Sequence, residues 1–208
     1  MKTLAPGPRI GRRLLNLYSG LVLFGVSSAM IVASGLGLGP WDVFHQGLAQ
    51  RIGVSLGWVV VGVGLLILLL WIPLRQRPGL GTISNAIVIG LMIDVTLAFL
   101  TQPESPAGRL GLLLGGVVGT GIGTGLYIGA GLGPGPRDGL MTGLAARGHS
   151  IRVVRTALEL SALAVGWWLG GTVGVGTLVF ALAIGPLSHY FIPLLTVGPT
   201  ANAGSEAR

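Results

Sequence analysis

Cysteine is absent from the 208 residues, and charged residues make up only 9% of them. The first absence excludes disulfides, thiolate metal sites and thiol catalysis. Soluble domains carry about 25% charged residues, so the second argues against a soluble fold. Hydrophobic residues make up 51% of the chain, and the mean hydropathy is +0.81. We therefore predict an all-α protein that forms a single membrane domain over residues 1–208, with the lipid bilayer as its surroundings.

The chain also lacks the motifs of common enzyme and nucleic-acid sites. No Walker loop, hydrolase constellation or metal-ligand spacing is present, and the histidines at positions 45, 149 and 189 are scattered. The net charge of +7 comes from basic residues in short loops and at the N-terminus, not from a basic face with interleaved aromatics. We expect no nucleic-acid binding, no metal, no cofactor and no enzymatic activity.

An internal repeat is the most informative feature that is present. Gly-Leu-Gly-Leu-Gly-Pro-Trp-Asp at 35–42 returns as Gly-Leu-Gly-Pro-Gly-Pro-Arg-Asp at 131–138. Gly-Thr-Ile at 81–83 returns as Gly-Thr-Leu at 176–178. The first copy covers about 14–100 and the second about 110–195, and we expect the polar tail at about 199–208 to be disordered.

Six apolar stretches approach the roughly 20 residues that a helix needs to cross a bilayer. Each copy holds three, so the copies should lie in the membrane upside down relative to each other, as in many secondary transporters. With the N-terminus in the cytoplasm, 11 of the 13 Lys and Arg residues fall on the inner side, and only Arg51 and Arg109 fall outside. Both termini are then cytoplasmic. The predicted spans are 14–35, 56–73, 81–100, 110–131, 152–171 and 174–195.

The two Gly-Pro-x-Asp segments each predict a short helix after the first span of their copy. Pro40 and Pro136 suit the first helical position, where the missing N–H is no loss. Asp42 and Asp138 then fall in the first turn, where a carboxylate complements the helix dipole. Two geometries fit. The short helices could lie at the membrane interface, with Trp41 as an anchor, or they could be re-entrant and direct their N-termini to the midplane.

Two further patterns make local predictions. Ser55 and Ser150 each precede an apolar run and are expected to cap the following helix. The fourth span carries glycines four residues apart, which predicts close approach of helix backbones in lipid; the alternative is a pore-lining or moving helix. These glycines fall in two rows, at 111, 115, 119 and 123 and at 121, 125 and 129.

Ionisable residues inside predicted spans are candidates for function, because a charge in the bilayer is costly. Asp94, Glu159 and His189 are of this kind, and Asn85 is a neutral polar neighbour. Glu159 and His189 should lie at similar depth on neighbouring helices of a hairpin. With Arg155 one turn before Glu159, they could form an inner polar cluster, with either a coupling role or a structural one.

These residues carry a resemblance. Gly-Leu-Gly-Pro-Trp-Asp-Val at 37–43, the glycines and serine at 53–57 and the polar positions of 81–94 resemble the YczE-like bacterial membrane proteins, which are distantly similar to the YitT-type family. The match extends from the first span to about Pro193. The resemblance implies a multi-pass protein of the bacterial inner membrane. The activity of the family is uncharacterised, and a role in transport is one expectation. The resemblance implies no catalytic residues.

Two functions fit these observations. The first is a transporter or channel for a small polar or anionic solute, with candidate residues among the polar positions. The second is a non-transporting scaffold or assembly factor for another membrane protein. A transporter should have a polar, water-accessible cavity between the repeats, whereas a scaffold should be a dry, closed bundle. The candidate residues are Asp42, Asp138, Asp94, Glu159, His189, Arg155 and Asn85.

Overall fold

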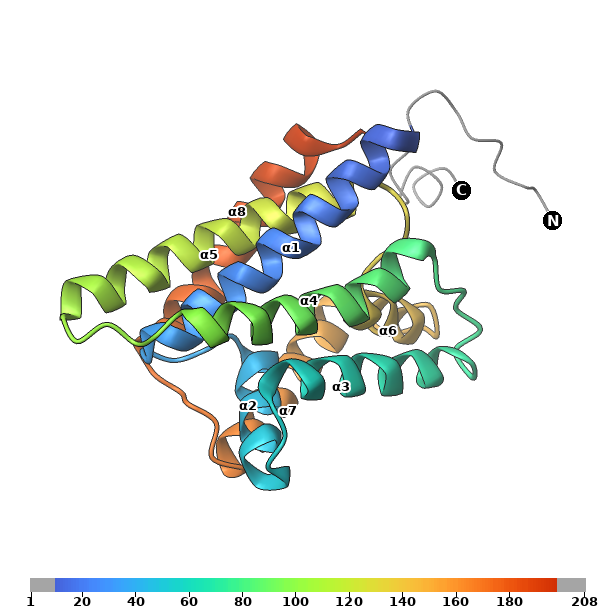
Figure 1. The fold of residues 1–208 in the computed structure, drawn as a ribbon. Coiled ribbons are helices and arrows are strands. Elements are labelled where there is room, and N and C mark those ends of the chain that lie inside the picture. The colour runs from blue at the N-terminus through green and yellow to red at the C-terminus, as the bar shows by residue number, and fades with distance from the viewer. Residues whose placement is uncertain (1–9, 198–208) are drawn as a thin grey trace.

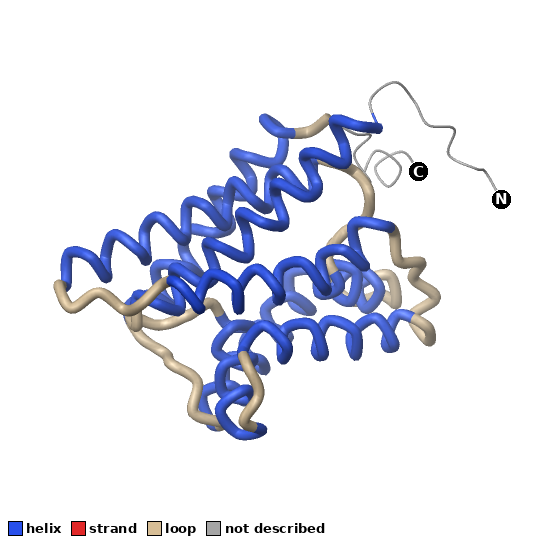
Figure 2. The backbone as a smooth tube through the Cα atoms, in the orientation of Figure 1, coloured by secondary structure: helices blue, strands red, loops and turns tan. Residues whose placement is uncertain are grey.

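The computed structural model describes residues 10–197, and these fold into helices with no strand among them (Figures 1 and 2). The fold class predicted from composition is therefore all-α, as observed. The expected disorder of the tail at 199–208 lies outside the described residues. The helices are α1 (Ile10–Ser34), α2 (Pro40–Ile52), α3 (Leu56–Trp71), α4 (Leu80–Phe99), α5 (Pro106–Gly129), α6 (Pro136–Ala145), α7 (Ile151–Trp168) and α8 (Val175–Leu195).

Each predicted span coincides with a helix, but the helices differ in their fitness to cross a membrane. Four helices, α1, α4, α5 and α8, are long and apolar enough to span a bilayer. A fifth span is available if α2 and α3, which meet at 112°, count as one broken span or re-entrant loop. Helix α7 is not among these candidate spans, and it carries three charged residues, Arg152, Arg155 and Glu159. The structure thus supports a multi-pass membrane protein with four to five candidate spans.

The short helices α2 and α6 begin at Pro40 and Pro136, as predicted. Each has its aspartate in the first turn, near the unpaired N–H groups of the helix. The serines behave differently. Ser55 and Ser150 occupy the capping positions of α3 and α7, but neither side chain makes a cap hydrogen bond. The Ser55 hydroxyl donates to Asp94 instead, which explains why the expected local bond is missing.

The glycine rows on α5 serve two different helices. In the first row, a Cβ on Gly119 would meet the Ser27 hydroxyl of α1, and one on Gly123 would lie 2.9 Å from the Gly20 carbonyl oxygen of α1. A Cβ on Gly125 would lie 2.8 Å from the Phe191 carbonyl oxygen of α8. Helix α5 therefore packs between α1 and α8, with small residues that let the backbones approach, as the spacing predicted.

Hydrogen bonds between helix ends and loops show which helix ends lie together at each end of the molecule. At one end, Arg13 Nη2 at the start of α1 donates to the Gly131 carbonyl after α5 (2.7 Å), and Arg147 Nη2 after α6 donates to the Pro73 carbonyl after α3 (2.6 Å). At the other end, the Leu38 amide before α2 donates to the Thr172 carbonyl before α8 (3.3 Å). Figure 1 shows the first turn of α1 and the last turn of α8 at the same end.

The two helix hairpins of the chain pack differently. Helices α3 and α4 lie against each other, whereas α7 and α8 make almost no contact within the described residues. Helix α7 packs on α2 instead: a Cβ on Gly47 would meet the Gly166 carbonyl oxygen. Helix α8 packs on α5 and buries only Gly176 and Thr177. The expectation that the last two spans are packed neighbours is therefore wrong.

Candidate functional site

A cavity of about 490 Å³ lies where the N-terminal ends of α2 and α6 face each other. Each of the eight helices in the described chain contributes to its lining. Its walls are apolar in large part, including Phe24, Ile89 and Phe180, and the polar side chains come mainly from α2, α6 and α7. Its volume is within the range of about 300–1,000 Å³ typical of small-molecule sites.

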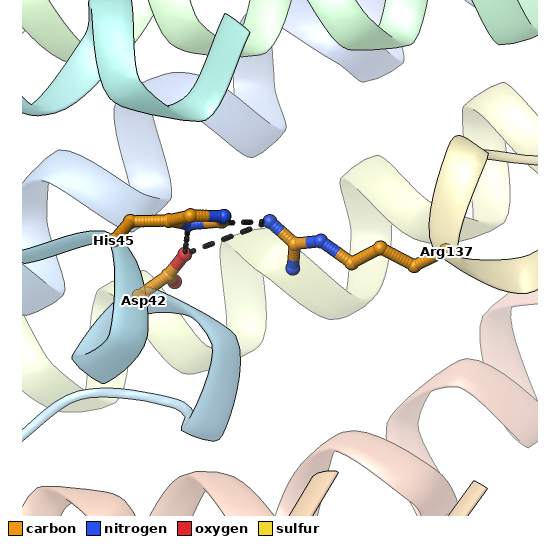
Figure 3. Close-up of polar contacts among 3 residues, drawn as sticks. All are labelled: Asp42, His45 and Arg137. Atoms are coloured by element: carbon orange, nitrogen blue, oxygen red, sulfur yellow. Dashed lines mark hydrogen bonds and ion pairs between the residues drawn. The ribbon is translucent and has the colours of Figure 1, made fainter. Parts of the chain in front are cut away.

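A polar cluster from α2 and α6 forms the centre of this site. Figure 3 shows Asp42 and His45 of α2 turned toward Arg137 of α6. Arg137 Nη2 lies 3.5 Å from His45 Nδ1 and 4.0 Å from Asp42 Oδ1, and His45 Nδ1 lies 3.4 Å from the same carboxylate oxygen. The Arg137 guanidinium also sits 5.0 Å from the centre of the Trp41 ring, within cation–π distance. These contacts join the two Gly-Pro-x-Asp segments.

The α6 side of the cavity has its own hydrogen bonds. Tyr127 Oη donates to Asp138 Oδ2 at 3.0 Å, and Trp71 Nε1 donates to the Pro136 carbonyl at 3.0 Å. Gly135 leaves room for this arrangement, since a Cβ there would lie 3.1 Å from Asp138 Oδ2 and 3.4 Å from Asn85 Nδ2. The first turn of α6 is therefore held against α3 and α5, with the Asp138 carboxylate facing the cavity.

Two buried nitrogen atoms in the cluster have no hydrogen-bond partner among the described residues: Trp41 Nε1 and His45 Nε2. His45 is fully buried. Its Nδ1 can serve either Asp42, as donor, or Arg137, as acceptor, and Nε2 lacks a partner in both tautomers. Buried polar groups are paired in the great majority of cases, and an unpaired one costs about 1–3 kcal/mol. These two nitrogens, beside the charged side chains of the cavity, make the cluster the candidate ligand-binding site.

The α7 side of the cavity carries an ion pair. Arg155 Nε lies 2.9 Å from Glu159 Oε1, one turn along the helix, as predicted. The two side chains are 55% and 34% exposed, so the cavity reaches the surface here, next to Ala181 and Gly185 of α8, which are also exposed.

The Glu159→Gln variant should therefore unfold much like the original protein. Partly exposed pairs one turn apart on a helix contribute about 0.5 kcal/mol or less to the free energy of unfolding. Thermal unfolding of the detergent-purified protein measures this change, with Arg155→Gln as the matched partner variant. A loss of stability several times larger would assign the pair a structural role that its exposure does not suggest.

The structure separates the predicted candidates into two groups. Asp42, Asp138, Asn85, Arg155 and Glu159 line the cavity, whereas Asp94 and His189 do not. Asp94 accepts hydrogen bonds from Ser55 Oγ (2.5 Å) and the Gly57 amide (2.7 Å), and so joins the start of α3 to α4.

The expected contact between Glu159 and His189 is not formed. His189 is exposed and lies on α8, which is separated from α7. The short connecting loop predicted that the two helices pack together, but α7 packs on α2, where Gly47 faces Gly166.

The cavity residues missed from sequence include Trp41 as a site residue, His45, Tyr127 and Arg137. Arg137 was counted as an inner loop charge, although it stands at the repeat position of Trp41 in a helix first turn. His45 lies one turn after Asp42, a spacing that could have identified it. No signal in the sequence marks Tyr127. The described residues hold no group of three or more metal-ligating side chains.

Comparisons place the chain among bacterial proteins of unknown activity. A family model described as "Family of unknown function (DUF6198)" matches residues 11–193. An uncharacterized protein of Haemophilus influenzae is 42% identical over 180 residues, which cover 86% of this chain and 83% of that protein. The "Uncharacterized membrane protein YczE" of Bacillus subtilis is 34% identical over 180 residues, covering 85% of this chain and 83% of that protein. No solved structure matches significantly.

Proposed function

We propose that this chain, which belongs to the DUF6198 family of unknown function and resembles a membrane protein, is a secondary transporter for a small polar or anionic solute. One observation carries this proposal: the N-termini of two short helices meet at a cavity, where their charged side chains form a polar cluster. Secondary transporters bind solutes at interrupted helices, whose N-termini attract anionic groups. A scaffold or assembly factor, the second candidate, would not need this cavity.

Pairs of equivalent contacts support an inverted repeat. The Gly81 amide donates to the Leu132 carbonyl at 2.9 Å, and in the other half the Gly176 amide donates to Leu36 at 2.7 Å. Gly79 and Gly174 each donate to the threonine three residues on, both at 3.2 Å. Reciprocal contacts such as Gly81–Leu132 and Gly176–Leu36 are those that a two-fold axis between the halves would produce. With three spans in each half, the two copies would then be inverted.

The symmetry fails at the cavity, where a solute would bind. Arg137 stands at the repeat position of Trp41, and Phe180 stands at that of Asn85. Arg155 and Glu159 replace Val60 and Gly64 of the first half. A symmetric framework with an asymmetric polar lining suits a site that must move between two orientations while binding one solute in one way.

The packing of the hairpins indicates how the site would open. Helices α3 and α4 are joined through Asp94, whereas α7 and α8 lie apart and leave the cavity open beside Arg155. In an inverted repeat, these hairpins would be the two gates. The structure then corresponds to a state with the second gate open, and the other state would have α7 against α8 and α3 apart from α4.

The orientation follows from the basic residues. The helix ends that carry Arg13, Arg75 and Arg147 gather at one end of the molecule, which the positive-inside rule places in the cytoplasm. We propose six crossings, both termini in the cytoplasm and, from the bacterial relatives, a location in the inner membrane. We also propose that the protein is not an enzyme, because no nucleophile and base converge in the sequence.

Cysteine labelling in intact cells tests this function and topology together, and the native chain has no cysteine to interfere. Arg51→Cys should react with an impermeant thiol reagent from outside, and Arg147→Cys only after the inner face is exposed. Ser188→Cys, at the cavity wall, should react through water from the inner face. Labelling of the first two from one face would exclude the inverted repeat, and an unreactive Ser188→Cys would favour the dry scaffold.

A further inference from the structure

Resting on the proposed transport function, we infer that the cavity binds a zwitterion with an apolar body, in the manner of an apolar α-amino acid. The carboxylate binds at Arg137 and Trp41, the ammonium group binds at Asp138, and the side group fills the apolar wall. Charges of both signs around one cavity point to this class.

Arg137 and its neighbours provide the anion-binding half. A guanidinium has five N–H donors, and Arg137 spends few of them: its contacts to His45 and Asp42 are 3.5 and 4.0 Å long. Its side chain is 30% exposed within the cavity wall. Trp41 Nε1, a donor only, is buried and unpartnered within the described residues. A carboxylate supplies the acceptors that all these donors lack, with a bidentate geometry that suits arginine.

Carboxylates of the cavity provide the cation-binding half. Asp138 uses Oδ2 to accept from Tyr127, and no hydrogen bond to Oδ1 is formed by the described residues. Around the whole cavity, three carboxylates stand against two guanidinium groups; they are Asp42, Asp138 and Glu159 against Arg137 and Arg155.

The presence of both signs around the cavity favours a solute that carries both. A simple anion would add to an excess of negative charge, and a simple cation would meet Arg137. A zwitterion pairs with both groups and leaves the balance unchanged.

The rest of the lining is apolar and suits an apolar side group. Aromatic and branched side chains form it, in a volume sufficient for a small solute. Burial of such a group gives binding free energy without further polar contacts. These residues are Phe24, Val60, Ile89, Ile128, Phe180 and Ile184.

Three probes that share one apolar body separate the classes: L-phenylalanine, 3-phenylpropionate without the ammonium group, and 2-phenylethylamine without the carboxylate. Calorimetric titration of the detergent-purified full chain should show L-phenylalanine binding at least about tenfold more tightly than either analogue, since each charge-assisted hydrogen bond is worth that much. Equal binding of the acid or of the amine, or no binding of L-phenylalanine, would overturn the inference.

Two variants test the two halves separately. Arg137→Gln should weaken L-phenylalanine binding by about tenfold or more and strengthen 2-phenylethylamine binding. Asp138→Asn should also weaken L-phenylalanine binding, but it should strengthen 3-phenylpropionate binding. Arg152→Gln, an exposed arginine outside the cavity, is the matched control and should change nothing. If Arg137→Gln does not fold, Arg137→Lys keeps the charge and should lose the bidentate fit. Parallel losses for all three probes would overturn the assignment of the halves.

A lipid head group could supply the same zwitterion, so the titration is repeated in nanodiscs of phosphatidylglycerol with and without phosphatidylethanolamine. If phosphatidylethanolamine competes with L-phenylalanine, the site belongs to a head group. If L-phenylalanine binds equally well in both kinds of nanodisc, the site belongs to a free solute. Binding without uptake into proteoliposomes would leave the zwitterion site and remove the transport function. Absent binding, together with the expected cysteine labelling, would remove the zwitterion and leave the transport function.

Discussion

A disulfide is expected to form between Ser150→Cys and His189→Cys, although these positions lie on helices that are apart in this structure. They are the repeat equivalents of Ser55 and Asp94, whose side chains meet at 2.5 Å. If the hairpins are alternate gates, α7 and α8 must come together as α3 and α4 do here. A disulfide needs Cα atoms about 4.4–6.8 Å apart, so it reports that approach and traps it.

The measurement is the gel shift or mass of the oxidised protein in membranes. Ser55→Cys with Asp94→Cys is the matched control, because these side chains already touch, and it should cross-link rapidly. The Ser150–His189 pair should cross-link more slowly but to completion, since oxidation is irreversible and draws the minor state from the population. Uptake by the trapped protein should fall to background and return on reduction. A pair that never cross-links would indicate a rigid bundle, as a scaffold requires.

Substitution of Gly116 should have a large effect on folding. A Cβ at this position would lie 2.6 Å from Ile31 Cγ1 and 2.7 Å from the Ser27 carbonyl oxygen, part of the α1 backbone. Gly116→Ala should therefore cost about 1–3 kcal/mol of stability, as overpacking does, and Gly116→Leu should not yield folded protein. Thermal unfolding and the monodisperse yield after detergent extraction measure these effects.

Gly111→Ala is the matched control, because Gly111 lies on the same helix and nothing lies within 4 Å of its added Cβ. It should unfold at the same temperature as the original protein or a higher one, since alanine favours a helix over glycine by about 1 kcal/mol. Similar losses for both variants would show that flexibility of α5, not contact with α1, requires the glycines.

Several elements follow from local sequence. Apolar runs of sufficient length predicted α1, α4, α5 and α8, and the positions of Pro40 and Pro136 predicted the starts of α2 and α6. The glycine spacing on α5 predicted close packing, and the Arg155–Glu159 pair followed from one turn of helix. These features depend on neighbours within a few residues, where helix geometry fixes which side chains meet.

The composition of the sequence by itself determined a helical membrane protein, and its repeat determined where the short helices begin. Only the tertiary structure decided that these helices face one cavity, that Arg137 meets Asp42 and His45 there, and that His189 lies away from Glu159. The reason is physical. Helices in lipid gain little from hydrophobic burial against each other, so close packing of small residues selects their partners. The fit of Gly47 to Gly166 takes α7 to α2, away from α8, and leaves the cavity open.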